Sequence, residues 1–325
     1  DGELFNLSFE LLTPTRITSF EELATHSLMA KHTFSYNYSL LLLQKGRKKV
    51  DYGHDFVAFA PEFNQKMKRD YELAITDSIN LDKTYLTLLP QPFSVDLAKR
   101  FSQRFKGSSF LNEKASKKVF ERTAKEHKII HIGTHAENNN INPELSRLIF
   151  AKDAQESASL DNNSLYTYEI YNYDLSSDLA ILTACETGKP TYQAGEGMIS
   201  LAHAFNYAGS ESILTSLWEI DEKSSTEILS NFYENLEKGM DKDKALQQAK
   251  LAYLKQATGR TMAPQYWAGL VLMGDTAPIT ISTQTNWIWW ILMAIGLSIA
   301  LFLIHKIGYF RRGFFKEGVQ KFSGP

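Results

Sequence analysis

The sequence predicts an α/β fold in which a mostly parallel sheet carries helices on both faces. Short apolar runs of strand length alternate along the chain with stretches whose apolar residues recur at helical spacing. Connections from strand to helix to parallel strand are right-handed, and such connections place helices on the faces of one sheet. The 325 residues suffice for one large domain of this class with a smaller appendage.

The clearest predicted strand covers residues 179–185 and ends in Cys185, the only cysteine of the chain. It is a short apolar run, and a turn containing Gly188 and Pro190 follows it. In open α/β sheets, ligands bind just outside the carboxyl ends of such strands. We therefore expect this strand to deliver a thiol to an edge where ligands bind.

A second apolar run, residues 128–135, ends in His135 and leads into the polar loop 136–142. A lone cysteine is usually just a small buried hydrophobic residue. A histidine at the end of a neighbouring parallel strand favours the alternative, a site that contains both His135 and Cys185.

The remaining elements are predicted from the same two patterns: short apolar runs indicate strands, and apolar residues at helical spacing indicate helices. Residues 62–95 are polar and are broken by Pro90 and Pro92, so they are expected to form an irregular surface insertion. Further strands are predicted at 56–60, 148–151 and 212–218, and helices at 112–126 with Asn112 as cap, 164–171, 198–205, 224–236 with a Ser224–Glu227 capping box, and 241–256 with Asp241 as cap.

Composition excludes several classes of protein. A formal net charge of −2 provides no basic face for nucleic acid, and one cysteine excludes an intrachain disulfide.

His131 and His135 are four residues apart, a spacing that binds zinc on a helix. Here the segment is predicted to be a strand, and no glutamate stands between the pair as in H-E-x-x-H. We expect no metal and no other cofactor.

The C-terminal region has a different character. Residues 287–304 contain no charge, and about twenty apolar residues suffice for a helix to cross a bilayer. Aromatic residues flank this segment on both sides, as in aromatic belts. The sequence therefore predicts a domain at 1–276, a linker at 277–286, a single transmembrane helix at 287–307 and a short basic tail at 308–325.

Positive charge lies on one side of this segment. Short flanks rich in Lys and Arg tend to stay in the cytoplasm, and neither residue occurs between Arg260 and Trp287. The rule predicts a cytoplasmic tail and a domain outside the membrane or in a periplasm. A tail-anchored domain in the cytoplasm remains the alternative. The basic residues after the segment are Lys306, Arg311, Arg312, Lys316 and Lys321.

Several motifs in a defined order accompany the two strand ends. They occur in residues 1–276 and resemble the CHAT family, bacterial caspase-like cysteine peptidases related in fold to caspases and separase. The motifs are the opening residues 1–10, Ala184-Cys185-Glu186-Thr187-Gly188, Gly195-Glu196-Gly197, Ala208-Gly209-Ser210, Leu217-Trp218, Phe232-Tyr233, Tyr266-Trp267-Ala268 and Met273-Gly274-Asp275.

The resemblance implies a caspase-like sheet and a His-Cys dyad that hydrolyses peptide bonds. Cys185 would be the nucleophile and His135 the donor of a proton to the leaving amine. A free thiol has a pKa of about 8.5, so Cys185 needs a positive partner, for which His135 is the candidate. The oxyanion would bind the backbone N–H groups of Cys185 and of Ala136, where the family often has glycine.

Two questions stay open at this point. Trp218, at the end of a predicted strand, either lines a substrate pocket or closes the core. The chain is either an active membrane-anchored peptidase for protein or peptide substrates, or a catalytically silent caspase-like interaction module. Because it begins at Asp1 within a family motif, we expect a longer protein, and the resemblance implies N-terminal helical repeats of the tetratricopeptide type.

Overall fold

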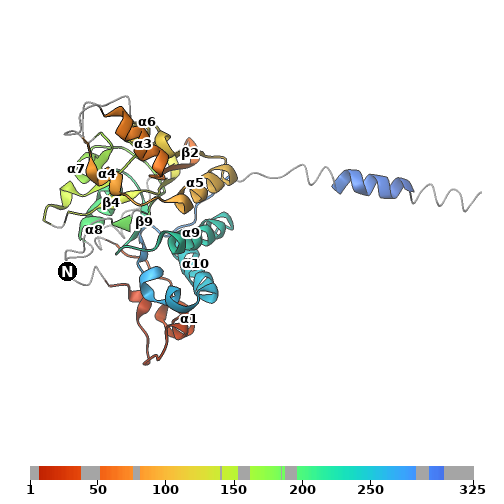
Figure 1. Ribbon diagram of the computed structural model, residues 1–325. Helices are drawn as coiled ribbons and strands as arrows, with labels where there is room; N and C mark the ends of the chain where they lie inside the picture. The colour runs from red at the N-terminus through yellow and green to blue at the C-terminus, as the bar shows by residue number, and fades with distance from the viewer. Residues whose placement is uncertain are drawn as a thin grey trace, which may run out of the picture. The chain divides into compact units, whose positions relative to one another are not determined.

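Two compact units make up the chain, residues 1–283 and residues 284–325. The first unit is an α/β domain in which helices surround a central sheet (Figure 1). The protein is represented by a computed structural model, which describes residues 7–37, 52–75, 81–139, 141–152, 162–183, 185–186, 196–282 and 293–303.

Six strands form the central sheet, in the order β10-β9-β7-β3-β1-β2. All neighbouring pairs are parallel except β10 with β9, which is antiparallel at one edge. The prediction of a mostly parallel sheet is therefore confirmed. The strands are β1 (His54–Ala60), β2 (Ser108–Leu111), β3 (His127–Ile132), β7 (Leu179–Leu182), β9 (Ser212–Ser216) and β10 (Leu270–Gly274).

Helices pack on both faces of this sheet. Successive side chains of a strand point to opposite faces, so Phe56 and Ala58 enter one hydrophobic core while Val57 and Phe59 enter the other. The first core includes α5 (Pro92–Arg104), α9 (Glu222–Glu237) and α10 (Lys242–Gln256), and the second includes α6 (Lys117–Thr123) and α8 (Glu196–Tyr207).

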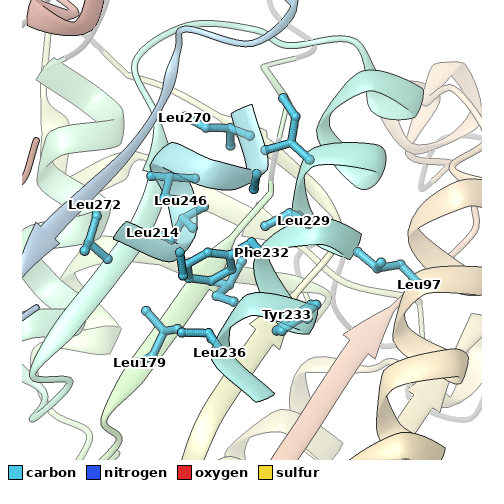
Figure 2. Close-up of a cluster of buried hydrophobic side chains, with 14 of the residues drawn as sticks. Leu97, Leu179, Leu214, Leu229, Phe232, Tyr233, Leu236, Leu246, Leu270 and Leu272 are labelled. Carbon is cyan, nitrogen blue, oxygen red and sulfur yellow. The ribbon is translucent and has the colours of Figure 1, made fainter. Parts of the chain in front are cut away.

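Aromatic side chains hold α5 and α9 over β1. The ring centroid of Tyr233 in α9 lies 4.6 Å from that of Phe101 in α5 and 5.7 Å from that of Phe56 in β1. Figure 2 shows Phe232 and Tyr233 among the labelled leucines of the same core. Truncating such a buried aromatic residue to alanine costs about 3–5 kcal/mol. Helix α5, whose first turn lies beside the site described below, is therefore firmly packed against α9 and β1.

A second, four-stranded sheet has the order β6-β5-β4-β8. Its β4 is parallel to β8, whereas β5 is antiparallel to both β4 and β6. Both β4 and β8 begin a few residues after β3 and β7 end, so the two sheets meet there. The strands are β4 (His135–Glu137), β5 (Arg147–Ile149), β6 (Ser164–Tyr166) and β8 (Cys185–Glu186).

The prediction of an irregular insertion at residues 62–95 is wrong. The region contains α3 (Gln65–Ala74), α4 (Lys83–Thr87) and the start of α5. Side chains of Asn64 and Asp82 accept hydrogen bonds from the first turns of α3 and α4, and Pro92 is the first residue of α5, where its missing N–H costs nothing. The polar residues of this region therefore cap the helices or lie on their exposed faces.

Two helix predictions also need correction. Within 112–126, a 3-10 turn (Asn112–Lys114) precedes α6, and Ser116 caps this helix in place of Asn112. The predicted helix 164–171 begins instead as β6, because it pairs with β5, and only then continues as α7 (Thr167–Ile170). A further short helix near the N-terminus is α1 (Leu23–His26).

The C-terminal unit contains a helix at residues 293–303. The predicted membrane span at 287–307 includes this helix, but residues 287–292 and 304–307 lie outside the described residues. Within the part of the chain that is described, no helix combines the length and the apolar character needed to cross a membrane. The basic tail at 308–325 also lies outside the described residues.

Candidate active site

His135 lies where the chain passes from the main sheet to the second sheet. Gly133 still pairs with β1, donating its N–H to Phe59 O at 2.9 Å. Beyond Pro61 the chain of β1 turns away, so β4 pairs with β5 instead, and the Thr134 hydroxyl donates to Ile149 O. This change of partner divides the predicted strand 128–135 in two and makes His135 the first residue of β4.

Cys185 is the first residue of β8, which follows β7 in the same way as β4 follows β3. Its Cα is the register partner of the His135 Cα in the parallel pair β4–β8. Hydrogen-bonded strands lie about 4.8 Å apart, so the two backbones are direct neighbours. The structure thus brings both predicted dyad positions together, although the Cys185 side chain lies outside the described part of the chain.

The His135 ring is held in one orientation by its surroundings. Its Nε2 lies 2.7 Å from Leu89 O, and its ring centroid lies 5.1 Å from that of Phe63. A carbonyl oxygen only accepts hydrogen bonds, so Nε2 carries the proton and Nδ1 carries a lone pair. Among the described residues, this buried Nδ1 has no hydrogen-bond partner. The ring therefore keeps one basic nitrogen available for chemistry.

Burial lowers the pKa of His135, and the nearby positive charge of Lys68 lowers it further, whereas the bond to Leu89 O acts in the opposite direction. The imidazole is therefore neutral near neutral pH. We expected His135 to supply a positive charge that stabilises a thiolate, but its buried position disfavours the charged form. A neutral ring is suited instead to accept the thiol proton during attack.

Residues 88–91, immediately before α5, provide the carbonyl that orients His135. Sequence reasoning missed this segment, because a backbone carbonyl leaves no signature in the side-chain pattern. Three hydrogen bonds hold the segment and the first turn of α5: Gln91 N to Glu62 O at 2.8 Å, Lys68 Nζ to Leu88 O at 2.5 Å, and Ser94 N to Glu222 Oε1 at 2.8 Å.

Glu222, the first residue of α9, caps a different helix. Its carboxylate accepts the N–H group of Ser94, which has no partner within the first turn of α5. Burial raises the pKa of this carboxyl. The predicted Ser224 cap of α9 is wrong, because Asp221 Oδ1 accepts from Ser224 N at 2.9 Å. Asp221 and Glu222 are adjacent in the chain, and they cap α9 and α5, respectively.

The other two predicted site residues occupy defined places. Ala136 is fully buried in β4, in register with Leu148 of β5 and with Glu186 of β8. Trp218 follows β9, donates its indole N–H to Gln265 O at 3.3 Å and packs against both hydrophobic cores. Trp218 therefore closes the core, and its contact with substrate remains a prediction.

Human tetratricopeptide repeat protein 28 is 28% identical over 107 residues, which are 33% of this chain and 4% of that protein. The chain therefore spans a small fraction of this relative.

Among solved structures, gingipain R, an Arg-specific cysteine proteinase, matches with a TM-score of 0.41 and 9% identity, covering 70% of this chain and 48% of that chain. Separase from Saccharomyces cerevisiae, in complex with securin, matches with a TM-score of 0.36 and 12% identity, covering 68% of this chain and 12% of that chain. The CHAT domain model matches residues 1–275. The chain therefore belongs to the CHAT domain family.

Proposed function

We propose that this protein is a cysteine endopeptidase in which His135 and Cys185 form the catalytic dyad. One observation carries the proposal: the two residues are register partners on adjacent strands, and the histidine ring keeps a buried Nδ1 without a partner among the described residues. A basic nitrogen beside a thiol position is the arrangement that nucleophilic catalysis by cysteine requires. The substrates would be proteins or peptides.

In the acylation step, the Cys185 thiol gives its proton to Nδ1 of His135 while its sulfur attacks the peptide carbonyl carbon. Leu89 O stabilises the resulting imidazolium, because it still accepts the proton of Nε2. The tetrahedral intermediate then collapses. Nδ1 donates its proton to the leaving nitrogen, the C–N bond breaks, and a thioester with Cys185 remains.

In the deacylation step, a water molecule attacks the thioester carbonyl and gives a proton to Nδ1. Collapse of the second intermediate breaks the C–S bond, and the proton on Nδ1 returns to the sulfur of Cys185. The neutral resting state of His135 suits both steps, because the ring must accept a proton at the start of each.

The negative oxygen of each intermediate needs hydrogen-bond donors. The backbone N–H groups of Cys185 and Ala136 are the candidates that family membership suggests. Ala136 supplies an N–H as glycine does, but its Cβ restricts the backbone more. Substituting Ala136 with glycine tests whether that restriction limits turnover.

The alternative is a CHAT domain that binds partners without turnover. Reaction with iodoacetamide separates the two functions, since Cys185 is the only thiol of the chain. The peptidase predicts that alkylation of Cys185 near neutral pH depends on His135 as the base, so the thiol should react faster in the parent than in His135→Ala. Equal rates in both proteins support the binding module.

Digestion of a peptide library by the 325-residue chain and by its Cys185→Ala variant tests the activity itself. Fragments should appear with the parent chain and be absent with the variant. Equal cleavage by both proteins would show that the activity does not belong to this site. The cut positions would also identify the side chain preferred before the cleaved bond.

We further propose that residues 287–307 anchor the protein to a membrane and that repeats N-terminal to the domain regulate it. The first proposal rests on the uncharged apolar sequence and the second on the family. The charge pattern favours a domain outside the membrane with a cytoplasmic tail. Protease treatment of intact spheroplasts tests this: loss of the domain supports the outward orientation, and protection until lysis contradicts it.

A further inference from the structure

Lys68 is a buried lysine without an anionic partner among the described residues. It is the fourth residue of α3, and its ammonium donates to Leu88 O at 2.5 Å. Three other buried lysines have carboxylate partners: Lys242 with Asp178 and Asp275, Lys250 with Glu10, and Lys152 with Asp82. Lys68 therefore differs from them, because among the described residues only a carbonyl dipole balances its charge.

Such a position is unfavourable for a lysine. Burial disfavours the ammonium ion, and the first turn of a helix adds the positive end of the helix dipole. Groups held in costly electrostatic surroundings tend to occur at functional sites. The surroundings of Lys68 therefore direct attention to what its charge and its hydrogen bond do.

The hydrogen bond of Lys68 acts on the segment that orients the candidate histidine. Leu88 O accepts from Lys68, and the next carbonyl along the chain, Leu89 O, accepts from Nε2 of His135. The two carbonyls belong to consecutive peptide planes that meet at the Leu89 Cα, so once the first plane is held, only φ and ψ of Leu89 orient the second. Leu89 itself is largely exposed, and its side chain does little to hold the segment.

The charge of Lys68 acts on the same ring. It lowers the pKa of His135 in addition to the effect of burial. Residues 88–91 carry no ionisable side chain, and Arg147 of the neighbouring β5 pairs with Glu137 at 2.6 Å. Lys68 is the charged group among the described residues that shifts the pKa of His135, and Cys185 and Glu186 of β8 lie beside His135 and Ala136 by register.

We propose that Lys68 is a positioning residue for His135, which holds Leu89 O against Nε2–H and so leaves Nδ1 as the base. The inference rests on the proposed peptidase function. It adds to the His-Cys pair a third side chain, which acts through the backbone of residues 88–89 and through its charge.

Nuclear magnetic resonance of the His135 ring nitrogens in the 325-residue chain tests this proposal without any substrate. The ring signals are assigned with the His135→Gln variant. The parent should show the Nε2–H tautomer and a pKa below the ordinary value for histidine. In Lys68→Met, which loses both hydrogen bond and charge, a second tautomer should appear, and the pKa of His135 should change less than in a variant that loses the charge alone, because the hydrogen bond to Leu89 O raises the pKa and the Lys68 charge lowers it.

Two further variants separate the two effects. Lys68→Gln keeps a donor for Leu88 O but no charge, so the tautomer should persist while the pKa of His135 rises. Lys68→Arg keeps both and should behave like the parent. The matched control is Lys66→Met on the same helix, because Lys66 is exposed and pairs with Asp70 and Glu113. It should leave the His135 signals unchanged.

Turnover of a peptide found in the library digest provides the second measurement. Lys68→Met should lower kcat by about tenfold or more with little change in KM, because a hydrogen bond to a charged group is lost away from the substrate. Lys68→Arg should restore most of kcat. This measurement depends on the peptidase activity, whereas the ring signals do not, so failure of one proposal is distinguishable from failure of the other.

The proposal is overturned if Lys68→Met folds and its His135 tautomer equals that of the parent, or if the pKa of His135 in Lys68→Gln equals that of the parent. It is also overturned if Lys68→Met and Lys68→Gln both fail to fold while Lys68→Arg folds, since Lys68 would then serve the stability of the domain. Thermal unfolding of each variant identifies that outcome.

Discussion

His131 and His135 are four residues apart, and both rings are buried with one nitrogen hydrogen-bonded and the other without a partner among the described residues. Nδ1 of His131 lies 2.7 Å from the hydroxyl of Tyr233, inside the core between β3 and α9. Nε2 of His135 lies 2.7 Å from a backbone carbonyl, at the junction of the two sheets. The two rings are thus buried to a similar extent but have different hydrogen-bond partners.

The partner decides what each ring is able to do. A hydroxyl both donates and accepts, so Tyr233 is compatible with either tautomer of His131. A carbonyl accepts only, so Leu89 O defines the tautomer of His135 and leaves Nδ1 as the base. His131 is also enclosed by the core, whereas His135 is in register with Cys185. Burial alone is therefore a poor guide to which histidine is catalytic.

The largest expected effect is the loss of turnover on replacing His135. The His135→Ala variant should lose at least about 1,000-fold in kcat/KM, because neither proton transfer then has its base. His131→Gln is the comparison, since glutamine can still hydrogen-bond with Tyr233. It should stay within a few-fold of the parent, measured below the melting temperature of both variants. Equal losses in both variants would contradict the assignment of the two histidines.

The next effect concerns stability at acid pH. Full burial lowers the pKa of His131 to about 4. Above pH 6.5 the ring is neutral in both states, but between pH 6.5 and 4 only the unfolded chain binds the proton. His131 should therefore cost about 1.4 kcal/mol of stability per pH unit, or about 3 kcal/mol by pH 4.

Urea denaturation at several pH values measures this effect. The stability of His131→Gln should fall less between pH 6.5 and 4 than that of the parent, by about 3 kcal/mol. His32→Gln, at an exposed histidine, should follow the parent curve. Parallel curves for the parent and His131→Gln would mean that His131 is protonated in the folded state.

The smallest effect concerns the helix start beside Leu89. Glu222→Ala removes the acceptor for the Ser94 N–H group in the first turn of α5, so it should cost about 1 kcal/mol of stability. The control is Glu227→Ala on the same helix, because Glu227 makes only an exposed pair with Lys223. Glu227→Ala should cost less than about 0.5 kcal/mol. Chemical denaturation distinguishes the two values.

Some elements could be predicted from the sequence because their signals are local. The side chains of the strand at 56–60 alternate between the two hydrophobic cores, and the strand stops before Pro61. The same pattern of short apolar runs identified His135 and Cys185 as the residues that end two such runs. The helices of residues 62–95 were missed because caps such as Asn64 and Asp82 resemble loop residues until the following turn is seen.

The sequence by itself determined the α/β class, the mostly parallel sheet and the positions of His135 and Cys185 just beyond two neighbouring strands. Period-two and helical patterns are encoded locally, and the carboxyl ends of parallel strands share one edge. Only the tertiary structure decided where β3 gives way to β4, which carbonyl meets His135 and where the Lys68 ammonium is buried. Leu89 is 46 residues from His135 in the chain, and its carbonyl is the same chemical group in every residue. Contacts of that kind depend on how distant segments pack, so no local side-chain pattern predicts them.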